Sequence, residues 1–381
     1  MTTVVVAGAL ANKAGSGGEA WVRMSWVDGL RRLGLDVWFV EEISSTRWTA
    51  ADAGFMSRAT AWFEDVVTRV GIADRAALLD TDGEGDRGVD RTTIVDVLGS
   101  AELLVNISGH LRQPSLLALP RRRVYVDIDP GYTQIWHLQG ADLGVAAHDL
   151  HLTVGVNLGR PSCAIPDAGF DWIPVLPPTV LEEWSAPPLA ELDRFTTVAS
   201  WRGAFGPIEH GGVQYGPKAH EFRRFAELPR LVDVPFEIAL DIHPADARDR
   251  RLLVENGWQL VDPSVAAGGM DEFRRYVLDA AAEFSVAQGV YVHARSGWFS
   301  DRTARYLAAG RPALVQDTGL AESLPTGEGL LTFSSVDDAV DAAARLAREY
   351  TAHAEAAAAF AAEHLAAERI LPPVLDRARI R

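Results

Sequence analysis

The segment from Ser296 to Gly319 carries the residue types and the spacing of an anion-binding site. Ser300 is placed to cap a helix, and the first turn of a helix leaves backbone N–H groups free to meet a ligand. Arg302 falls in that turn, where a cation opposes the helix dipole, so an arginine is favoured there if it and the N–H groups share a bound phosphate. Gly310 and the Arg-Pro pair after it would end the helix before a buried strand. The alternative is an ordinary strand–helix–strand unit with a surface Asp301–Arg302 pair.

Two further cations follow predicted strands or open predicted helices in the second half of the chain. Arg202 comes directly after the first strand of that half, and Lys218 falls in the first turn of a helix that Pro217 would open. Of the 36 basic residues only Lys13 and Lys218 are lysines, a usage typical of a GC-rich bacterial genome. Lysine is a compact charge that arginine replaces poorly at some phosphate sites. One shared anion would account for Arg202, Lys218 and the helix start at 300–302 together, whereas solvated cations explain each of them singly.

A glycine-rich loop at residues 12–19 follows the first predicted strand. It does not fit the dinucleotide-binding fingerprint, because six residues separate Gly8 from the next glycine, although Glu41 ends the second strand where a ribose-binding acid would stand. The spacing before the lysine of this loop also excludes a phosphate loop of the Walker type. We expect a flexible loop that faces the substrate rather than a cofactor cradle. Its acceptor-side residues would be Lys13, Gly17 and Gly18.

Acids and histidines at predicted strand ends are the candidates for proton transfer. Asp127 and Asp129 alternate along a strand, which places both carboxylates on one face. The pair resembles a DxD metal motif, but no third hard ligand is near and Asp129-Pro-Gly reads equally as a turn, so we expect no metal. Asp129 could act as a general base, and so could His110 at the end of another strand, since histidine titrates near neutral pH. His243 follows a strand of the second half and is expected to contact a nucleotide.

The elements that position these residues alternate between strands and helices through both halves of the chain. An apolar strand, the glycine-rich loop, a helix from Trp21 and a strand at 36–43 open the first half, a β-loop-α-β unit typical of a parallel sheet. In the second half we expect, among other elements, a helix at 270–282 and a short strand at 289–294. We therefore predict an α/β protein with two doubly wound, Rossmann-like domains that face each other across a cleft.

Length and composition bound the organisation further. The 381 residues and a proline-rich stretch at 165–188 predict domains at 1–185 and 190–345, followed by helices at 346–381. One cysteine excludes internal disulfides and a cysteine metal cluster and favours a cytoplasmic location. The net charge of −16 argues against nucleic acid or an anionic membrane as a partner. No stretch approaches the apolar length of a membrane span.

The second half of the chain resembles the donor domain of GT-B glycosyltransferases. The resemblance rests on Gly297-Trp-Phe-Ser-Asp-Arg followed by Leu-Ala-Ala-Gly-Arg-Pro, on Asp317-Thr-Gly, and on Gly327-Glu-Gly-Leu-Leu. It is strong over residues 195–335 and weak before them. It implies transfer of a sugar from a nucleoside diphosphate sugar to a small-molecule, natural-product or glycoconjugate acceptor. The first domain would then bind the acceptor, and the helices at 346–381 would cross back onto it.

The resemblance also implies roles for single residues. The donor diphosphate would be bound by Arg202, Lys218, Ser300, Asp301 and Arg302, and the donor sugar and nucleoside by His243, Asp317, Thr318 and Gly319. Neither a metal nor a cofactor beyond the donor co-substrate is implied. Retaining members carry two glutamates eight residues apart, and alignment on Gly310 places Gly297 and Arg305 at these positions. The nucleotide and the stereochemical outcome therefore stay open.

Three other functions fit parts of this pattern. A nucleotide-sugar epimerase of the same fold would need acid and base carboxylates in the cleft and no acceptor pocket. A catalytically silent, sugar-nucleotide-binding partner would keep the phosphate site and lack a base. A Rossmann oxidoreductase fits least. The sequence determines neither the acceptor nor the sugar nor the oligomeric state.

Overall fold

The computed structural model describes residues 1–46, 52–83, 85–203 and 205–380. The first half of the chain forms an eight-stranded sheet in the order β4-β3-β2-β1-β5-β6-β7-β8. Its strands are β1 (Thr3–Ala7), β2 (Asp36–Ile43), β3 (Ala76–Asp80), β4 (Arg87–Gly88), β5 (Leu103–Ile107), β6 (Arg123–Asp127), β7 (Leu150–Thr153) and β8 (Trp172–Pro174). All neighbours are parallel except β3 and β4. The helices of this half are α1 (Gly17–Arg32), α3 (Phe55–Arg69), α4 (Arg91–Ser100), α5 (Pro114–Leu117) and α6 (Tyr132–Leu138).

The second half forms a six-stranded, fully parallel sheet in the order β13-β12-β9-β14-β15-β16. Its strands are β9 (Phe195–Ser200), β12 (Phe236–Asp241), β13 (Gln259–Val261), β14 (Ala282–Ser285), β15 (Ala313–Gln316) and β16 (Leu330–Phe333). A separate hairpin joins β10 (Ile208–His210) to β11 (Val213–Tyr215). The helices are α7 (Lys218–Arg224), α8 (Ala247–Glu255), α9 (Pro263–Ala266), α10 (Met270–Leu278), α11 (Gly289–His293), α12 (Asp301–Ala308) and α13 (Val336–Arg348).

Both sheets reverse their strand order beside their first strand, between β1 and β5 and between β9 and β14. Such a reversal defines the doubly wound fold, and ligands bind outside the carboxyl ends of the strands at this point. The central strands β1, β5, β14 and β15 are short and almost wholly buried, as a parallel sheet covered on both faces requires, whereas the edge strand β4 is exposed. The predicted fold class, two Rossmann-like domains, is confirmed.

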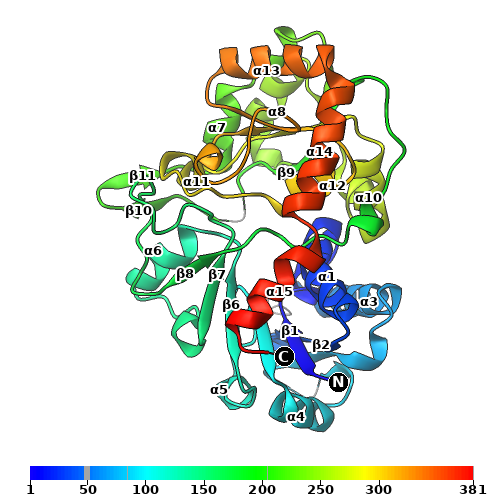
Figure 1. The fold of residues 1–381 in the computed structure, drawn as a ribbon, viewed down its shortest axis with the longest axis vertical. Helices are drawn as coiled ribbons and strands as arrows, with labels where there is room; N and C mark the ends of the chain where they lie inside the picture. Colours follow the sequence, from blue (N-terminus) through cyan, green and yellow to red (C-terminus); the bar gives the residue numbers. More distant parts are fainter. Residues whose placement is uncertain (47–51, 84, 204, 381) are drawn as a thin grey trace.

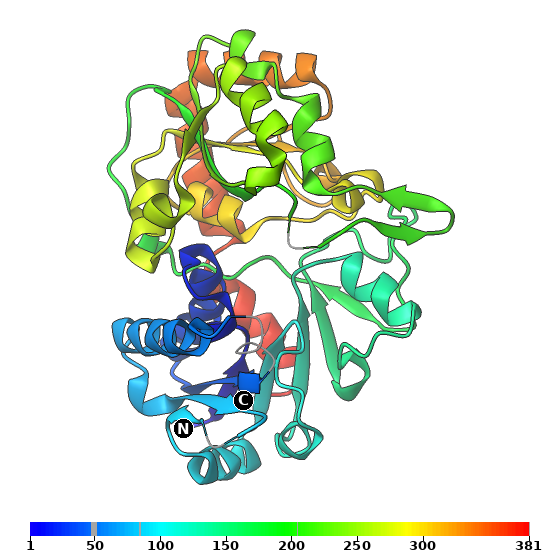
Figure 2. The same cartoon turned by 180° about the vertical axis from the view of Figure 1, so that it is seen from behind.

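The end of the chain crosses from the second domain back to the first (Figures 1 and 2). Helix α14 (Tyr350–His364) belongs to the upper half of Figure 1, and α15 (Ala367–Arg377) lies against α1 in the lower half. The contact is close, because a Cβ atom at Gly29 of α1 would stand 2.6 Å from Cδ1 of Leu371. The crossing passes beside the interdomain connection, where the Thr179 N–H donates to the Leu365 carbonyl oxygen at 2.8 Å.

Two elements near residue 285 differ from the prediction. Helix α10 ends at Leu278, and the segment expected to finish that helix contains the start of the buried strand β14 instead. The expected strand at 289–294 is helix α11. A four-residue strand buried on both faces shows no alternation, and its Ala-rich approach favours a helix by propensity alone. Tertiary packing overrides the β-propensity of Val-Tyr-Val in α11.

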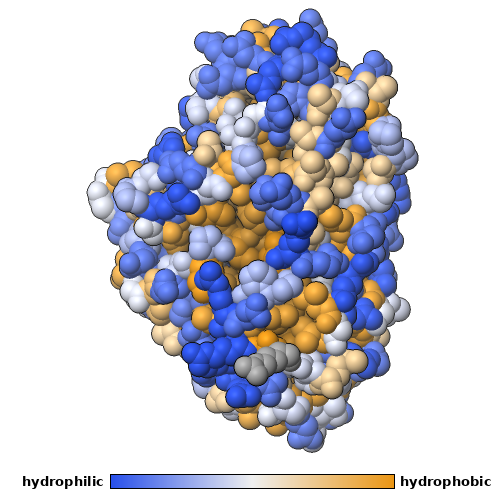
Figure 3. Space-filling view, in the orientation of Figure 1, coloured by the Kyte–Doolittle hydropathy of each residue, from blue (hydrophilic) through white to orange (hydrophobic). Residues whose placement is uncertain are grey.

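The two domains share apolar packing in several buried clusters. Trp21 of α1, Trp184 of the connection, Phe273 of α10 and Leu371 of α15 belong to a single buried cluster. Figure 3 shows hydrophilic side chains over α13 at the top and apolar side chains gathered across the middle of that face. Within the described residues, no helix is both long enough and apolar enough to span a membrane.

Candidate active site

A cavity of about 840 Å³ lies between the two domains. The first domain lines it with residues that follow β1, β5 and β6 and with the start of α1. The second domain contributes Val198 of β9, Lys218 and the loop 298–302 that leads into α12. Most of these groups stand at the carboxyl ends of strands near a switch point, where doubly wound sheets bind their ligands.

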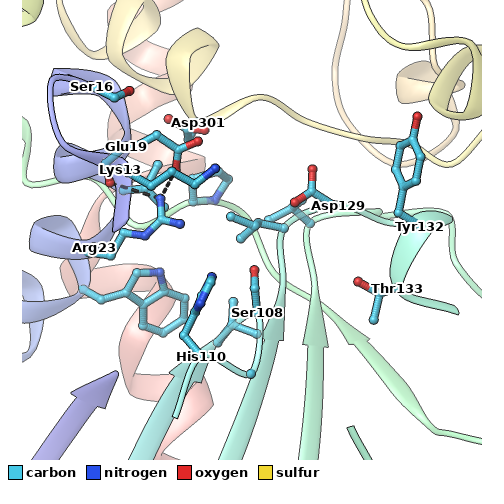
Figure 4. Close-up of a pocket in the computed structure, with 18 of the residues that line it drawn as sticks. Lys13, Ser16, Glu19, Arg23, Ser108, His110, Asp129, Tyr132, Thr133 and Asp301 are labelled. Atoms are coloured by element: carbon cyan, nitrogen blue, oxygen red, sulfur yellow. Dashed lines mark hydrogen bonds and ion pairs between the residues drawn. The ribbon is translucent and has the colours of Figure 1, made fainter. Parts of the chain in front are cut away.

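Asp129 lies centrally in this cavity, between side chains from α1 and the ring of Tyr132 (Figure 4). It follows β6, and its Oδ1 atom accepts a hydrogen bond of 2.9 Å from the hydroxyl of Tyr291, which belongs to the second domain. Burial, and then the negative charge of Asp127, raises the pKa of Asp129 to about 7. A carboxyl group that titrates near neutral pH is suited to act as a general base.

Asp127 is part of the scaffold rather than of the cavity. Its buried carboxylate accepts hydrogen bonds from Thr133 Oγ1 at 2.7 Å, Gln134 Nε2 at 2.9 Å, Thr153 Oγ1 at 2.8 Å and the Asp129 N–H at 3.0 Å. The two aspartates therefore build a strand-ending turn rather than a pair of free ligands. In the described part of the chain, no group of three or more His, Cys, Asp or Glu side chains is arranged to hold a metal ion.

His110 lines the same cavity after β5. Ser108 before it has a φ of +55°, a left-handed conformation that is rare for serine, and the turn presents both side chains at the strand end (Figure 4). Burial, and then the charges of Arg23 and Lys13, lowers the pKa of His110 to about 3. The ring is neutral at pH 7 and a far weaker base than Asp129, so it is better suited to hydrogen-bond a hydroxyl group.

Glu19 and Arg23, one turn apart on α1, form an ion pair in the cavity wall beside Lys13 (Figure 4). Arg23 is 1 % exposed and lies over Gly8, where a Cβ atom would stand 3.0 Å from the arginine Cγ. Burial alone would raise the pKa of Glu19, but the charges of Arg23 and Lys13 hold it below its ordinary value. The carboxylate stays ionised, and Lys13 adds a positive charge to this wall.

Lys218 lines the cavity from the second domain, at the first residue of α7. Burial, and then the positive charge of Arg302, lowers its pKa to about 7. The Arg302 guanidinium donates to Glu283 Oε1 at 2.6 Å, the Val198 carbonyl oxygen at 2.8 Å and Ser285 Oγ at 2.6 Å. Arg302 is thus a fixed positive charge beside Lys218. Its hydrogen-bond donors are largely occupied by acceptors of the protein itself.

Helix α12 begins at the cavity without a side-chain cap. Ser300 is its N-cap residue with an extended backbone, and its hydroxyl does not bond to the first-turn N–H groups. Asp301 follows, and burial raises the pKa of its carboxyl group. The helix start therefore borders the cavity without a side-chain cap, and its role as an anion site stays a prediction.

Two predicted donor-site residues lie outside this cavity. The Nε and Nη2 atoms of Arg202 both donate to the carboxylate of Asp246, each at 2.8 Å, and Arg202 lines a separate pocket of about 540 Å³. His243 is exposed, and its Nδ1 accepts from the Ala245 N–H at 3.1 Å to cap a turn. The expectation that Arg202 and Lys218 share one anion site is corrected, because a carboxylate on the next strand–helix loop holds the arginine away.

Residues 317–319 pack against the first domain instead of lining the cavity. Asp317 Oδ1 accepts from the Gly319 N–H at 2.8 Å, and the Thr318 hydroxyl donates to the Trp298 carbonyl oxygen at 3.0 Å. Asn157 of the first domain donates to the Gly319 carbonyl oxygen at 2.8 Å. The polar groups of residues 317–319, which were expected to orient the donor sugar, thus form hydrogen bonds with other protein atoms where the two domains meet.

The glycine-rich loop is held in place rather than flexible, which corrects the prediction. Both oxygens of the buried Glu41 are engaged, accepting hydrogen bonds from the N–H groups of Leu10 at 2.8 Å, Ala11 at 2.5 Å and Asn12 at 2.9 Å. These bonds explain why the acid stands where a ribose ligand would be expected. They fix the loop that carries Lys13.

Gly17 and Gly18 bring this loop against the second domain. The Gly17 N–H donates to the Ala267 carbonyl oxygen at 3.0 Å, and a Cβ atom at Gly17 would come within 2.0 Å of the Gly269 carbonyl oxygen. Gly18 lines the cavity, and a Cβ atom at this position would stand 3.1 Å from the Phe273 ring. Gly17 therefore serves the interface between domains, and only Gly18 reaches the cavity.

No known protein-family model matches the chain, and no curated protein has a similar sequence. Solved structures match it over its whole length. An α-glucosyltransferase in complex with UDP and a mismatched 13-mer DNA has a TM-score of 0.57 at 11% identity, over 100% of this chain and 99% of that one. HepE from Anabaena, in complex with UDP and glucose, has a TM-score of 0.59 at 11% identity over 99% of each chain. Sucrose-phosphate synthase from Thermosynechococcus elongatus has a TM-score of 0.53 at 12% identity, over 100% and 98%.

These neighbours are glycosyltransferases with two Rossmann-like domains. The chain has the GT-B fold. The predicted domain boundaries stay predictions, as do the roles assigned to single residues within this GT-B framework.

Arg305 occupies one of the two positions where the resemblance to retaining GT-B enzymes predicts a glutamate. The side chain is 1 % exposed, lines the cavity, and donates to Thr179 of the connection and to Ser25 of the first domain. Gly297 occupies the other position, with a φ of +66°, and a Cβ atom there would stand 2.8 Å from the Asn157 side chain. Neither position supplies a carboxylate, so this GT-B site lacks that glutamate pair.

Glu19, Arg23 and Trp298 are among the cavity residues that were not predicted from the sequence. Glu19 and Arg23 could have been recognised from the sequence, because they are spaced to form an i,i+4 ion pair on a helix whose buried faces are otherwise largely apolar. Tyr291, which bonds to Asp129, was hidden because its segment was expected to be a strand.

Proposed function

We propose that this chain transfers a sugar from a nucleoside diphosphate sugar to a hydroxyl group of an acceptor held mainly by the first domain. One observation carries the proposal. The only two lysines of the sequence, Lys13 and Lys218, line one cavity from opposite domains of a GT-B fold. Neither forms an ion pair with a carboxylate in the described part of the chain. Two opposed lysine amino groups, of which Lys218 gains its full charge when an anion binds, suit a diphosphate bound between the domains.

The departing diphosphate carries the charge that such a reaction must stabilise. As the bond between the sugar carbon and the phosphate oxygen breaks, its electron pair passes to the diphosphate. Lys13, Lys218 and the uncapped start of α12 would stabilise that charge from fixed positions, which is the most effective form of electrostatic catalysis. Arg302 would add positive potential while it remains bonded to Glu283.

Asp129 would accept the proton of the acceptor hydroxyl as the oxygen attacks the sugar carbon. Its pKa of about 7 and its place in the cavity support this role over that of His110, whose pKa is lowered to about 3. A single displacement assisted by such a base inverts the configuration at the sugar carbon. Because the lysines supply the positive charge, we expect that no divalent cation is needed and that EDTA leaves the rate unchanged.

A two-step experiment tests the proposal. The melting temperature is first measured with a panel of nucleoside diphosphates and their sugars, since a ligand that binds only the folded state raises it. The donor selected in this way is then incubated with candidate acceptors, and free nucleoside diphosphate and glycosylated product are separated by chromatography. Equal amounts of both products are expected. An isomerised sugar nucleotide formed without acceptor, or no stabilisation by any nucleotide, would contradict the proposal.

A further inference from the structure

Two turns, one from each domain, exchange tyrosine hydrogen bonds across the cleft. The Tyr291 hydroxyl donates to Asp129 Oδ1 at 2.9 Å, and the Tyr132 hydroxyl donates to Gln288 Oε1 at 2.9 Å. Asp129 and Tyr132 are three residues apart on the turn into α6, and Gln288 and Tyr291 are three residues apart at the start of α11. Each turn therefore supplies one tyrosine and one acceptor to the other.

Both turns are held rigidly within their own domains. The Tyr132 N–H donates to the Asp129 carbonyl oxygen at 3.1 Å, and the Tyr291 N–H donates to the Gln288 carbonyl oxygen at 2.9 Å. The Tyr291 ring is 2 % exposed and stacks on Trp298 with ring centroids 4.6 Å apart and 19° between the planes. Burial, and then the charge of Asp129, raises the pKa of Tyr291 well above its ordinary value, so the hydroxyl stays a donor.

The carboxylate of Asp129 has one oxygen engaged and one available. In the described part of the chain Tyr291 is the only side chain that donates to it, and the donation is to Oδ1. The other charged groups that act on Asp129 are Asp127 on its own strand and Glu19 and Lys13 on the facing wall. Oδ2 is thus the atom left to meet an acceptor hydroxyl in the cavity.

We propose that Tyr291 is a positioning residue that orients the Asp129 carboxylate so that Oδ2 faces the acceptor hydroxyl. The inference rests on the proposed function, because it takes Asp129 as the base. Tyr132 and Tyr291 belong to one buried apolar cluster shared by both domains, which holds α11 against the turn into α6. The Asp129 carboxylate of the first domain therefore takes its orientation from the second domain, through the Tyr291 hydroxyl.

A matched pair of variants tests the inference. Tyr291→Phe removes the hydroxyl that meets Asp129 and keeps the ring on Trp298. Tyr132→Phe removes the other bond across the cleft and keeps the hydrogen bond from Tyr291 to Asp129. The pH dependence of kcat is measured for both. Because a hydrogen bond to a carboxylate favours its ionised form, Tyr291→Phe should move the acidic limb upward by about one pH unit and lower kcat with little change in the donor KM. Tyr132→Phe should leave the acidic limb in place.

A second measurement needs no activity and separates this inference from the proposed function. The carboxyl ¹³C resonance of Asp129, identified by its absence in Asp129→Asn, is titrated in the wild type and in both tyrosine variants. An upward pKa shift confined to Tyr291→Phe supports the positioning role even if the transfer assay fails. Equal titration curves in all three proteins, or equal shifts in both variants, would overturn it. If transfer persists in Asp129→Asn, the base assignment of the proposed function fails instead.

Discussion

Arg305 of α12 and Ser25 of α1 join the two domains through a buried hydrogen bond of 2.9 Å between the guanidinium and the serine hydroxyl. The same guanidinium donates to Thr179 Oγ1 of the connection at 2.7 Å. Burial lowers the pKa of Arg305 to about 10, against the opposing effect of the Asp301 charge. A buried charge held by neutral acceptors makes this contact a sensitive point of the interface.

Replacing Arg305 by methionine should destabilise the protein, because Ser25 and Thr179 lose their partner within the interface. The expected loss is about 2–4 kcal/mol of unfolding free energy, from unsatisfied buried polar groups. Urea denaturation followed by tryptophan fluorescence measures it. Arg348→Met is the control, since that side chain is 66% exposed and its ion-pair contact is 4.0 Å long. Equal denaturation midpoints for Arg305→Met and the control would contradict the role.

Asp129→Asn should separate activity from stability. Burial and Asp127 raise the pKa of Asp129 from 3.8 to about 7, so the unfolded chain releases this proton first and stability falls as pH rises from about 4 to 7. An asparagine side chain does not ionise, so it does not cause this pH-dependent loss of stability. The variant should therefore melt at a higher temperature than the wild type at pH 8, and the difference should shrink toward pH 4. Transfer should fall about 100-fold or more, as for the loss of a general base.

Calorimetry in buffers of different ionisation enthalpy should show proton uptake on nucleotide binding near pH 7.5. Burial and Arg302 lower the pKa of Lys218 to about 7, so the free protein holds this lysine largely neutral at pH 7.5. A bound diphosphate favours the charged form and raises the pKa, which draws a proton from the buffer. Affinity should also weaken as pH rises above 7. Lys218→Met should abolish the uptake, and an uptake that persists in this variant would assign it to another group.

Gly17→Ala should loosen the contact between the domains. A methyl group at this position would lie 2.0 Å from the Gly269 carbonyl oxygen, a backbone atom that cannot turn aside. Small-angle X-ray scattering should give a larger radius of gyration than the wild type, and the melting temperature should fall. Gly99→Ala is the matched control, because its Cβ atom meets nothing within 4 Å on α4. A radius of gyration equal to that of the wild type in both variants would contradict the prediction. It would show that the interface accommodates the methyl group without separating the domains.

The fold class could be predicted because many strands and helix starts have a local signal, although β14 and α11 do not. Asp129, His110, Lys13, Lys218 and the start of α12 could be placed near one cleft, because their positions at strand ends and helix starts follow from the order of elements. The remaining differences depend on distant partners. Arg202 is held by Asp246, and Gly319 is held by Asn157, 162 residues away in the chain. No local pattern reports such contacts, and Tyr291 was further hidden by its β-like sequence.

The central claim is that Lys13 and Lys218 bind one diphosphate between them. It is tested most directly by calorimetric titration of the best-stabilising nucleoside diphosphate into Lys13→Met, Lys218→Met and the control Arg202→Met, whose arginine is paired with Asp246 outside the cavity. Each lysine variant should bind about 10- to 100-fold more weakly, the effect of one charged hydrogen bond, and the arginine variant should bind like the wild type. Wild-type affinity in both lysine variants, or an equal loss in Arg202→Met, would contradict the account.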